Sequence, residues 1–385
     1  MRNIALDLAA RKIVLCEVAE GKVIQRRTVG SLDALSDLLG PGTAPSRVAI
    51  EACREAWHVH DVLTGWGHEV LLVDTTRVKQ LGIGQHGRKT DRIDAETLAR
   101  AVERGAIPLA HTLSKPRQEL RLELSVRRAL VESRAQLIVL VRGLVRAAGG
   151  RLPSCDSGSF LDQVARATLE APTRARIAPL LGVLAQVQKE LVFVEERLER
   201  LCATEPIILQ LSTVPGVGLI VAASFVSVID EAGRFRNAHQ VSAYLGLVPR
   251  EDSSGDRRRL GSITKSGNGY VRSMLVQAAW TILRLKNSSD PLRRWADAVA
   301  KRRGKRVAVV ALSRRLAGVL WAMWRDDTVY DAAVLAQESA RGHRRHAQDL
   351  ETRAAALELA AGKARRRTRR ITSTRQPATE AAVAR

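Results

Sequence analysis

The sequence predicts an α/β domain at the N-terminus, then long amphipathic helices, then a second, mainly helical domain. Short apolar segments that carry or end in acidic residues come first, and apolar residues at helical spacing follow. A compact apolar region with Pro-Gly turns comes third, and the last part of the chain after it is strongly basic. We expect an α/β domain over 1–112, a helical arm over 113–205, a helical domain over 206–330 and a basic tail over 331–385.

The first 112 residues alternate strand and helix signals. Residues 3–29 are predicted to form a β-hairpin, with an apolar segment around Asp7 and an alternating stretch that turns at Glu20-Gly21. Helices and strands then alternate, and this order resembles the start of a ribonuclease-H-like fold. The expected elements are helix 31–39, a strand ending at Glu51, helix 56–66, strand 68–74 and helix 90–105, which Glu96 and Arg100 stabilise and Gly105 ends.

Two long helical signals separate the predicted domains. One runs from Lys115 to about Ala148 and the other begins near Arg174, and a Gly/Pro/Ser-rich stretch joins them. Such a pair predicts an antiparallel coiled coil or a dimer-forming arm. The last 45 residues hold 12 Lys and Arg against four Asp and Glu without an apolar period, which predicts a helical fragment that fades into a disordered tail.

The composition points to a polyanionic partner. The formal net charge is +22, and nucleic acid is the commonest polyanion that a basic protein binds. Aromatic residues make up 3%, so base stacking is not expected to dominate binding. We interpret Cys16, Cys53, Cys155 and Cys202 as reduced packing residues of a cytoplasmic protein. We also expect that no apolar run reaches transmembrane length.

Four acidic residues form the first candidate site. Asp7 lies within an apolar strand, where a carboxylate is costly unless it is paired or binds a metal, and Glu51 ends another apolar strand. Asp91 and Asp94 are three residues apart, so a helix places both on one face. Four oxygen donors suit Mg²⁺ or Mn²⁺, and such ions assist phosphodiester chemistry. The alternative is that Asp91 only caps a helix, Glu51 is a surface residue, and Asp94 pairs with Arg92 or Lys89.

Two serines form the second candidate site. Ser253 and Ser254 precede Gly255 in a polar turn beside Arg257, Arg258 and Arg259. A serine hydroxyl can attack a phosphodiester when cations stabilise the developing charge. Lys265, Asn268 and Arg272 follow in a loop and helix start that suit phosphate. By residue chemistry alone, an ordinary polar turn is the better interpretation.

The third candidate is VPGVG at 214–218. Its glycines, Gly216 and Gly218, lie between two apolar segments and predict a helix-hairpin-helix that holds a DNA phosphate on backbone amides. A plain Pro-Gly junction between two helices explains the same residues.

Together these motifs resemble one protein family, the DEDD transposases of insertion sequences, to which the Piv/MooV site-specific invertases also belong. The similarity covers about residues 3–330, with a RuvC-like domain first and a C-terminal transposase domain second. After Glu51 the chain has ACREAW, where many members have a turn with Gly and Tyr. The motifs are LD at 6–7, IEACREAW at 50–57, GHEVLLVD at 67–74, KTDRIDAETLA at 89–99, PGVG at 215–218, FRNAHQVSAYLGLVPREDSSG at 235–255 and GSITKSGNGYVRSMLVQAAW at 261–280.

This resemblance implies roles for the candidate residues. Asp7, Glu51, Asp91 and Asp94 fall on the family's metal-binding tetrad, and Ser254, or else Ser253, falls on its covalent nucleophile. It also implies a homo-oligomer, a dimer or tetramer, that works on DNA at the bacterial nucleoid. A structured guide RNA and a divalent metal are implied, and a nucleotide cofactor is not.

Two other functions remain open. A Holliday-junction resolvase would use water as the nucleophile and would not need Ser253 or Ser254. A non-catalytic basic protein that binds RNA or DNA would use the acids only for structure. A tyrosine recombinase is poorly supported, because no matching Arg/His set surrounds Tyr244 or Tyr270.

Overall fold

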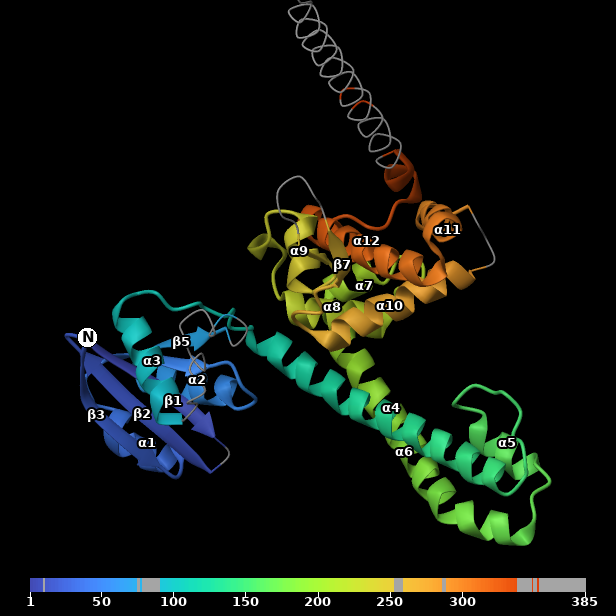
Figure 1. The fold of residues 1–385 in the computed structure, drawn as a ribbon, viewed down its shortest axis with the longest axis horizontal. Helices are drawn as coiled ribbons and strands as arrows, with labels where there is room; N and C mark the ends of the chain where they lie inside the picture. Colours follow the sequence, from blue (N-terminus) through green and yellow to red (C-terminus); the bar gives the residue numbers. More distant parts are fainter. Residues whose placement is uncertain are drawn as a thin grey trace, which may run out of the picture. The chain divides into compact units, whose positions relative to one another are not determined.

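The computed structural model separates into two compact units, residues 1–114 and 115–385 (Figure 1). Within them it describes residues 1–9, 11–74, 77, 91–252, 259–285, 289–337, 348 and 352, with the side chains of 91 and 92 outside that description. The predicted basic tail therefore lies outside the described residues beyond position 337, apart from two single positions.

A five-stranded mixed sheet forms the centre of the first unit. Its order is β3-β2-β1-β4-β5; β1, β2 and β3 are antiparallel, whereas β4 and β5 run parallel to β1. Parallel neighbours end at the same edge of a sheet, so the ends of β1, β4 and β5 lie together. The strands are β1 (Arg2–Ala9), β2 (Lys12–Ala19), β3 (Lys22–Val29), β4 (Ser46–Glu51) and β5 (Glu69–Val73).

The prediction of one hairpin over residues 3–29 was wrong, because this segment forms three strands. The second strand, β2, is buried at six successive positions and therefore needs neighbours on both sides. The turn at Glu20-Gly21, where both residues have positive φ, separates β2 from β3 as expected. The turn before β2 was missed because residues 8–12, LAARK, include no Gly, Pro, Asn or Asp to mark a turn.

Helices cover both faces of the sheet. On one face, α1 (Leu32–Leu39) and α2 (Ala56–Gly65) pack against a cluster that includes Ile4 and Leu6. On the other face, α3 (Asp91–Glu103) packs against a cluster that includes Ala5 and Val14. The helices predicted at 31–39, 56–66 and 90–105 are confirmed within two residues at their ends. The result is a three-layer α/β/α unit.

Two helices of 33 residues open the second unit. They are α4 (Lys115–Ala147) and α6 (Ala171–Ala203), which lie side by side, with α5 (Phe160–Arg166) at their far end (Figure 1). At that end they share a small core around Phe160. At the near end, Leu124 and Leu198 belong to the core of the following helices. The base of the long-helix pair is therefore built into the helical domain.

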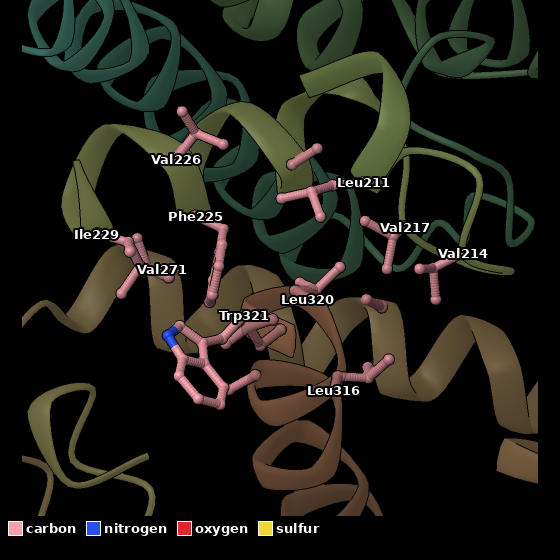
Figure 2. Close-up of a cluster of buried hydrophobic side chains, with 14 of the residues drawn as sticks. Leu211, Val214, Val217, Phe225, Val226, Ile229, Val271, Leu316, Leu320 and Trp321 are labelled. Atoms are coloured by element: carbon pink, nitrogen blue, oxygen red, sulfur yellow. The ribbon is translucent and has the colours of Figure 1, made fainter. Parts of the chain in front are cut away.

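A mainly helical domain completes the second unit. Its largest core contains Phe225 and Trp321, and the Trp321 indole donates a 2.9 Å hydrogen bond to the carbonyl of Ala232 (Figure 2). A two-stranded sheet, β6 (Pro249–Glu251) with β7 (Leu260–Ile263), lies beside the helices. The helices are α7 (Pro206–Leu211), α8 (Leu219–Ile229), α9 (Ala238–Tyr244), α10 (Gly269–Arg284), α11 (Pro291–Arg303) and α12 (Lys305–Asp326).

Two sequence expectations need correction here. We expected no apolar run of membrane length, yet α6 and α12 are long and apolar enough by length and composition alone. Both pack against other helices, and helices of this kind also occur in the cores of soluble proteins, so they indicate a membrane span only weakly. All four cysteines are free, but Cys53 is exposed and is not a packing residue.

Candidate functional site

The strand acids face α3. On β1, Asp7 pairs across the sheet with Val14, and on β4, Glu51 pairs with Val73. Both valines belong to the cluster that packs under α3. Because directly paired residues share one face of a sheet, Asp7 and Glu51 point to the face that α3 covers. Both side chains are half-buried at the shared C-terminal edge of β1 and β4.

The helix acids lie on the side of α3 that faces the sheet. Ala95, Leu98 and Val102 are buried against the sheet, and Asp94 is four residues before Leu98. The Asp94 carboxylate is accordingly buried, with 7% of the residue exposed. Asp91 is four residues before Ala95, so its backbone position continues the same face, while its side chain lies outside the described residues. Asp7, Glu51 and Asp94 thus lie on one interface between α3 and the sheet.

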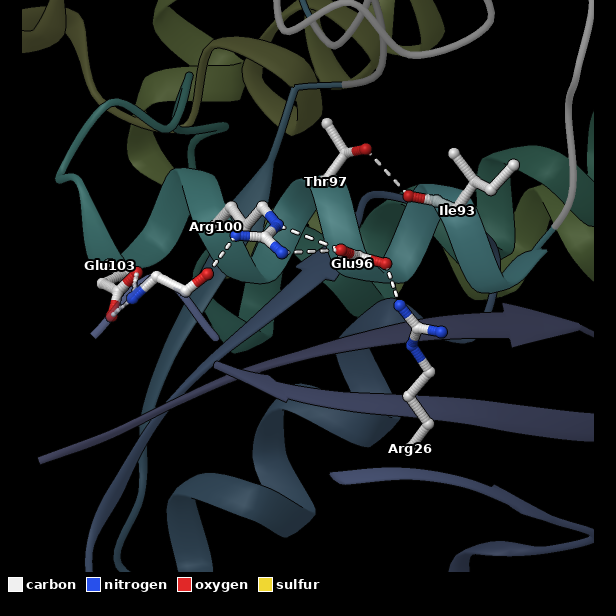
Figure 3. A network of polar contacts seen from close by, with 7 residues as sticks. Arg26, Ile93, Glu96, Thr97, Arg100 and Glu103 are labelled. Atoms are coloured by element: carbon white, nitrogen blue, oxygen red, sulfur yellow. Dashed lines mark hydrogen bonds and ion pairs between the residues drawn. The ribbon is translucent and has the colours of Figure 1, made fainter. Parts of the chain in front are cut away.

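A polar network fixes α3 on the sheet (Figure 3). Arg100 donates to Glu96 at 2.9 Å, as predicted, and also to the backbone carbonyl of Gly21. Arg26 of β3 donates to the other oxygen of Glu96, and Gly21 donates its amide to Glu103 at 3.1 Å. Sequence analysis missed Arg26 and Glu103, because their partners are 70 and 82 residues away. The network ties α3 to the β2–β3 hairpin.

The chemistry of these acids suits a divalent cation. Carboxylate oxygens are the donors that Mg²⁺ and Mn²⁺ prefer. Among the side chains that the structure describes, no three His, Cys, Asp or Glu residues gather closely enough to hold a metal ion. This set excludes the Asp91 side chain. The oxygen donors of these acids and the sheet face that they share are chemically compatible with a divalent cation.

The serine motif lies outside the described residues. Ser253, Ser254, Arg257 and Arg258 all fall in the segment 253–258. On either side of that segment, β6 pairs with β7, and the Asp252 amide donates a 2.9 Å hydrogen bond to the Arg259 carbonyl. The described residues therefore bring the two ends of the serine segment together as a β-hairpin does.

Two glycines hold the base of this hairpin. Gly246 and Gly267 have φ of +68° and +75°. A Cβ on Gly246 would lie 2.1 Å from the backbone oxygen of Ser266, and a Cβ on Gly267 would lie 2.1 Å from that of Tyr244. The Lys265 amide donates to the Gly246 carbonyl at 3.1 Å. The segments before β6 and after β7 therefore approach so closely that only glycine fits at these two positions.

Two residues predicted to bind phosphate make internal contacts. Asn268 caps α10, because its side-chain oxygen accepts hydrogen bonds from the amides of Tyr270 and Val271 at 3.0 and 3.1 Å. Arg272 donates to the carbonyls of Leu245 and Ser266 at 3.0 and 3.1 Å. These contacts stabilise the same crossing of segments. Arg259 is exposed, and Lys265 is exposed with φ of +58°.

A polar cavity of about 340 Å³ lies between α4 and the start of α10. Its lining includes Arg121 and Arg128 of α4 together with Asn268 and Tyr270. Arg128 lies over the Tyr270 ring at 5.4 Å, and burial lowers the pKa of Arg121 below its ordinary value. Neither arginine was predicted, because the cavity-lining residues outside α4 are far from it in the chain.

VPGVG connects α7 to α8, as predicted. Within it Gly216 has φ of +79°, and a Cβ there would lie 2.8 Å from Ile282 Cγ1 and 3.0 Å from the Ala278 carbonyl. Gly218 has an extended backbone and open space around its Cα. Packing against α10 therefore accounts for Gly216, whereas no contact accounts for Gly218.

Comparisons with known proteins assign this chain to a family of transposases. Residues 4–148 match the family model of DEDD transposases of the IS110 type. Residues 209–293 match the model described as transposase IS116/IS110/IS902 family. The chain belongs to this family of transposases. The family acts on DNA and typically uses divalent metal ions.

Individual relatives agree with this assignment. A probable family 20 transposase of Pseudomonas aeruginosa is 32% identical over 74% of this chain and 86% of its own length. The transposase for insertion sequence element IS1111A of Coxiella burnetii is 29% identical over 86% of this chain and 91% of its own length. The transposase for insertion sequence element IS1328 of Yersinia enterocolitica is 25% identical over 85% of this chain and 98% of its own length.

The two glycines of VPGVG allow a matched test. We predict that Gly216→Ala lowers the melting temperature of the protein, because alanine at positive φ costs about 1–2 kcal/mol before any steric clash is added. Gly218→Ala should leave the melting temperature unchanged, since a methyl group there meets no atom within 4 Å. Differential scanning calorimetry measures both. An equal loss in the two variants would contradict the packing role of Gly216, and a loss of DNA affinity confined to Gly218→Ala would support phosphate binding.

Proposed function

We propose that this transposase cleaves and rejoins DNA by serine attack, assisted by a divalent metal on Asp7, Glu51, Asp91 and Asp94. The proposal of a metal site is supported by the positions of Asp7, Glu51 and Asp94, which lie on one interface between α3 and the sheet. Bound there, a divalent cation would supply positive charge to the phosphate under attack. The half-buried strand acids and the buried Asp94 would hold it with little solvent competition.

In the proposed reaction, the Ser254 hydroxyl attacks a DNA phosphorus atom. The Ser254 oxygen forms a bond to phosphorus, one DNA P–O bond breaks, and the departing DNA oxygen takes up a proton and leaves as a hydroxyl. A hydroxyl of another DNA end then attacks the serine phosphodiester and releases Ser254. Each step exchanges one phosphodiester for another, so no nucleotide cofactor is required. Arg257, Arg258 and Arg259 follow the serine and provide charge for the pentavalent phosphorus.

The hairpin supports this assignment by its construction. Gly246, Gly267 and Arg272 brace the base of β6 and β7, on which the serine segment is carried. A nucleophile needs a fixed support, because small displacements lower the rate of attack strongly. Ser253 remains the alternative nucleophile.

The resolvase with water as nucleophile is the second candidate. It needs the same acids, and it leaves the braced hairpin without a catalytic role. We also propose, from the family resemblance, that a structured RNA guides the choice of DNA and that the protein works at the bacterial nucleoid. The net charge of +22 is compatible with both nucleic acids.

The serine mechanism predicts a covalent adduct. Incubation of the protein with DNA and Mg²⁺, followed by denaturation and digestion, should leave a nucleotide on the peptide that contains Ser254, as mass spectrometry would show. Ser254→Ala should abolish this adduct, and Ser133→Ala, on the exposed surface of α4, should retain it.

An adduct on Ser253 would keep the mechanism and move the nucleophile by one residue. Full cleavage by a Ser253→Ala, Ser254→Ala double variant would overturn the mechanism and favour the resolvase.

We further propose that the long-helix pair of α4 and α6 mediates self-association into a dimer or tetramer. Large apolar side chains remain exposed on both helices, among them Val139 at 70%, Phe193 at 57% and Val192 at 56%. Exposed apolar groups that recur along a helix pair are typical of a surface that a second helix pair covers.

This proposal predicts that Val139→Glu with Leu140→Glu lowers the mass in solution toward the 42.1 kDa of one chain. Buried carboxylates in an apolar contact would be strongly unfavourable. Lys189→Glu on exposed α6 surface changes the net charge by the same amount and should leave the mass unchanged. Multi-angle light scattering compares the three proteins. An unaltered mass in the double variant would exclude this surface as the contact.

A further inference from the structure

The corner between α11 and α12 carries an unusual density of positive charge. Five of the six residues from 301 to 306 are Lys or Arg, and Gly304 with φ of +86° makes the turn between the two helices. All six residues are exposed. The corner lies beyond residue 293, where the match to the second family model ends. We call Lys301, Arg302, Arg303, Lys305 and Arg306 the basic corner.

The cations of the basic corner lack acidic partners in the described part of the chain. No ion pair joins any of the five to an acid there, and the one side-chain hydrogen bond, from Arg302 to the Ala298 carbonyl, is long at 3.4 Å. On the same helix, Arg293 is different, because it donates to Asp297 at 2.8 Å. The basic corner therefore keeps its charge available for a partner outside the protein.

Part of this charge lies where it opposes folding. Lys301, Arg302 and Arg303 lie at the C-terminus of α11, where the helix dipole favours cations. Lys305 and Arg306 lie in the first turn of the 22-residue helix α12, where the dipole is positive and disfavours them. The N-cap residue is Gly304, which has no side chain to accept hydrogen bonds from the first-turn amides. An anion at this point would relieve both deficits.

We propose that the basic corner binds the phosphate backbone of duplex DNA outside the reacting site. The inference rests on the proposed action on DNA but is independent of the serine mechanism. Guanidinium and ammonium groups at a helix corner contact phosphates without reading bases. The aromatic residue of α11, Trp295, is partly buried against the core and lies beneath Arg315 at 4.9 Å. This ring is thus not offered for stacking of unpaired bases, which favours a duplex.

The test compares two sets of five substitutions by glutamine. One set neutralises the basic corner, and the matched control neutralises five exposed arginines near the far end of the long-helix pair, namely Arg146, Arg151, Arg166, Arg174 and Arg176. Each set lowers the formal charge by the same amount. Fluorescence anisotropy measures the affinity for a duplex DNA of about 40 base pairs over a series of salt concentrations. This length is well beyond the roughly 16 base pairs that a small double-stranded-RNA-binding domain spans. EDTA in the buffer prevents cleavage during the measurement.

Neutralising the basic corner should make the slope of log K against log salt less negative by about 0.9 for each phosphate group that the variant no longer binds, up to about 4.5 for all five cations. The control set should change the slope much less. Equal changes in the two sets, or an unchanged slope in the corner variant, would overturn the proposal. If the corner variant bound a duplex RNA of the same sequence more weakly than the unaltered protein does, yet bound the DNA equally well, the choice of DNA as the partner would be overturned. Because EDTA prevents metal-dependent chemistry, the salt dependence of binding is measured independently of whether a serine adduct forms.

A second measurement excludes a merely structural role. Without DNA, Lys305→Gln with Arg306→Gln should keep or raise the melting temperature, because it removes cations from a positive helix terminus. If the corner stabilised the fold, the melting temperature would fall instead, and the proposal would fail.

Discussion

The packing of α3 against one face of the sheet is the constraint on which the N-terminal site depends. Ala95, Leu98, Ala99 and Val102 bury that contact completely or nearly so. The same helix face, continued toward its N-terminus, carries Asp94 and the position of Asp91. Any rotation of α3 about its axis would expose apolar side chains and move both acids away from Asp7 and Glu51. The apolar contact thus determines where the carboxylates lie.

The polar network around Glu96 restricts the remaining freedom of α3. Apolar packing leaves a helix some freedom to slide along a sheet, and directional hydrogen bonds from Arg26 and to Gly21 remove it. Arg100 and Glu96 alone would only stabilise the helix locally. With Arg26 and Glu103 they connect the helix to the β2–β3 hairpin at two points. Because these groups are partly exposed, we regard them as positioning residues whose net contribution to stability is small.

Much of the fold followed from periodicity, and the errors have identifiable causes. The helices were predicted well, since their apolar spacing, the Glu96–Arg100 pair and the Gly105 stop are local signals. The number of strands over residues 3–29 was wrong, because the connection between β1 and β2 contains none of the residues that usually mark a turn. For the sites, sequence could place Asp91 and Asp94 on one helix face, whereas only the register of β1 with β4 brings Asp7 and Glu51 to the same side. The roles of Asn268 and Arg272 as cap and brace depend on tertiary contacts that no local pattern contains.

In the second unit, a rigid crossing of backbone segments lies at the base of β6 and β7. Gly246 and Gly267 permit a backbone crossing that residues with a side chain would prevent, and Arg272 bridges it. The base of α4 and α6 shares the core of this unit through Leu124 and Leu198. Deletion of all of residues 120–204 would therefore damage the helical domain, and point substitutions on exposed positions are the better test of self-association.

We propose that α3 and the sheet together form a divalent metal site. Electron paramagnetic resonance of Mn²⁺ titrated into the full-length protein tests it directly, because bound Mn²⁺ loses the signal of the free ion. We predict saturable Mn²⁺ binding that is lost in Asp7→Asn and in Asp94→Asn, while the circular dichroism spectra stay unchanged. Asp37→Asn, an exposed acid on α1, should bind as the unaltered protein does. Equal Mn²⁺ binding in all four proteins would contradict the claim.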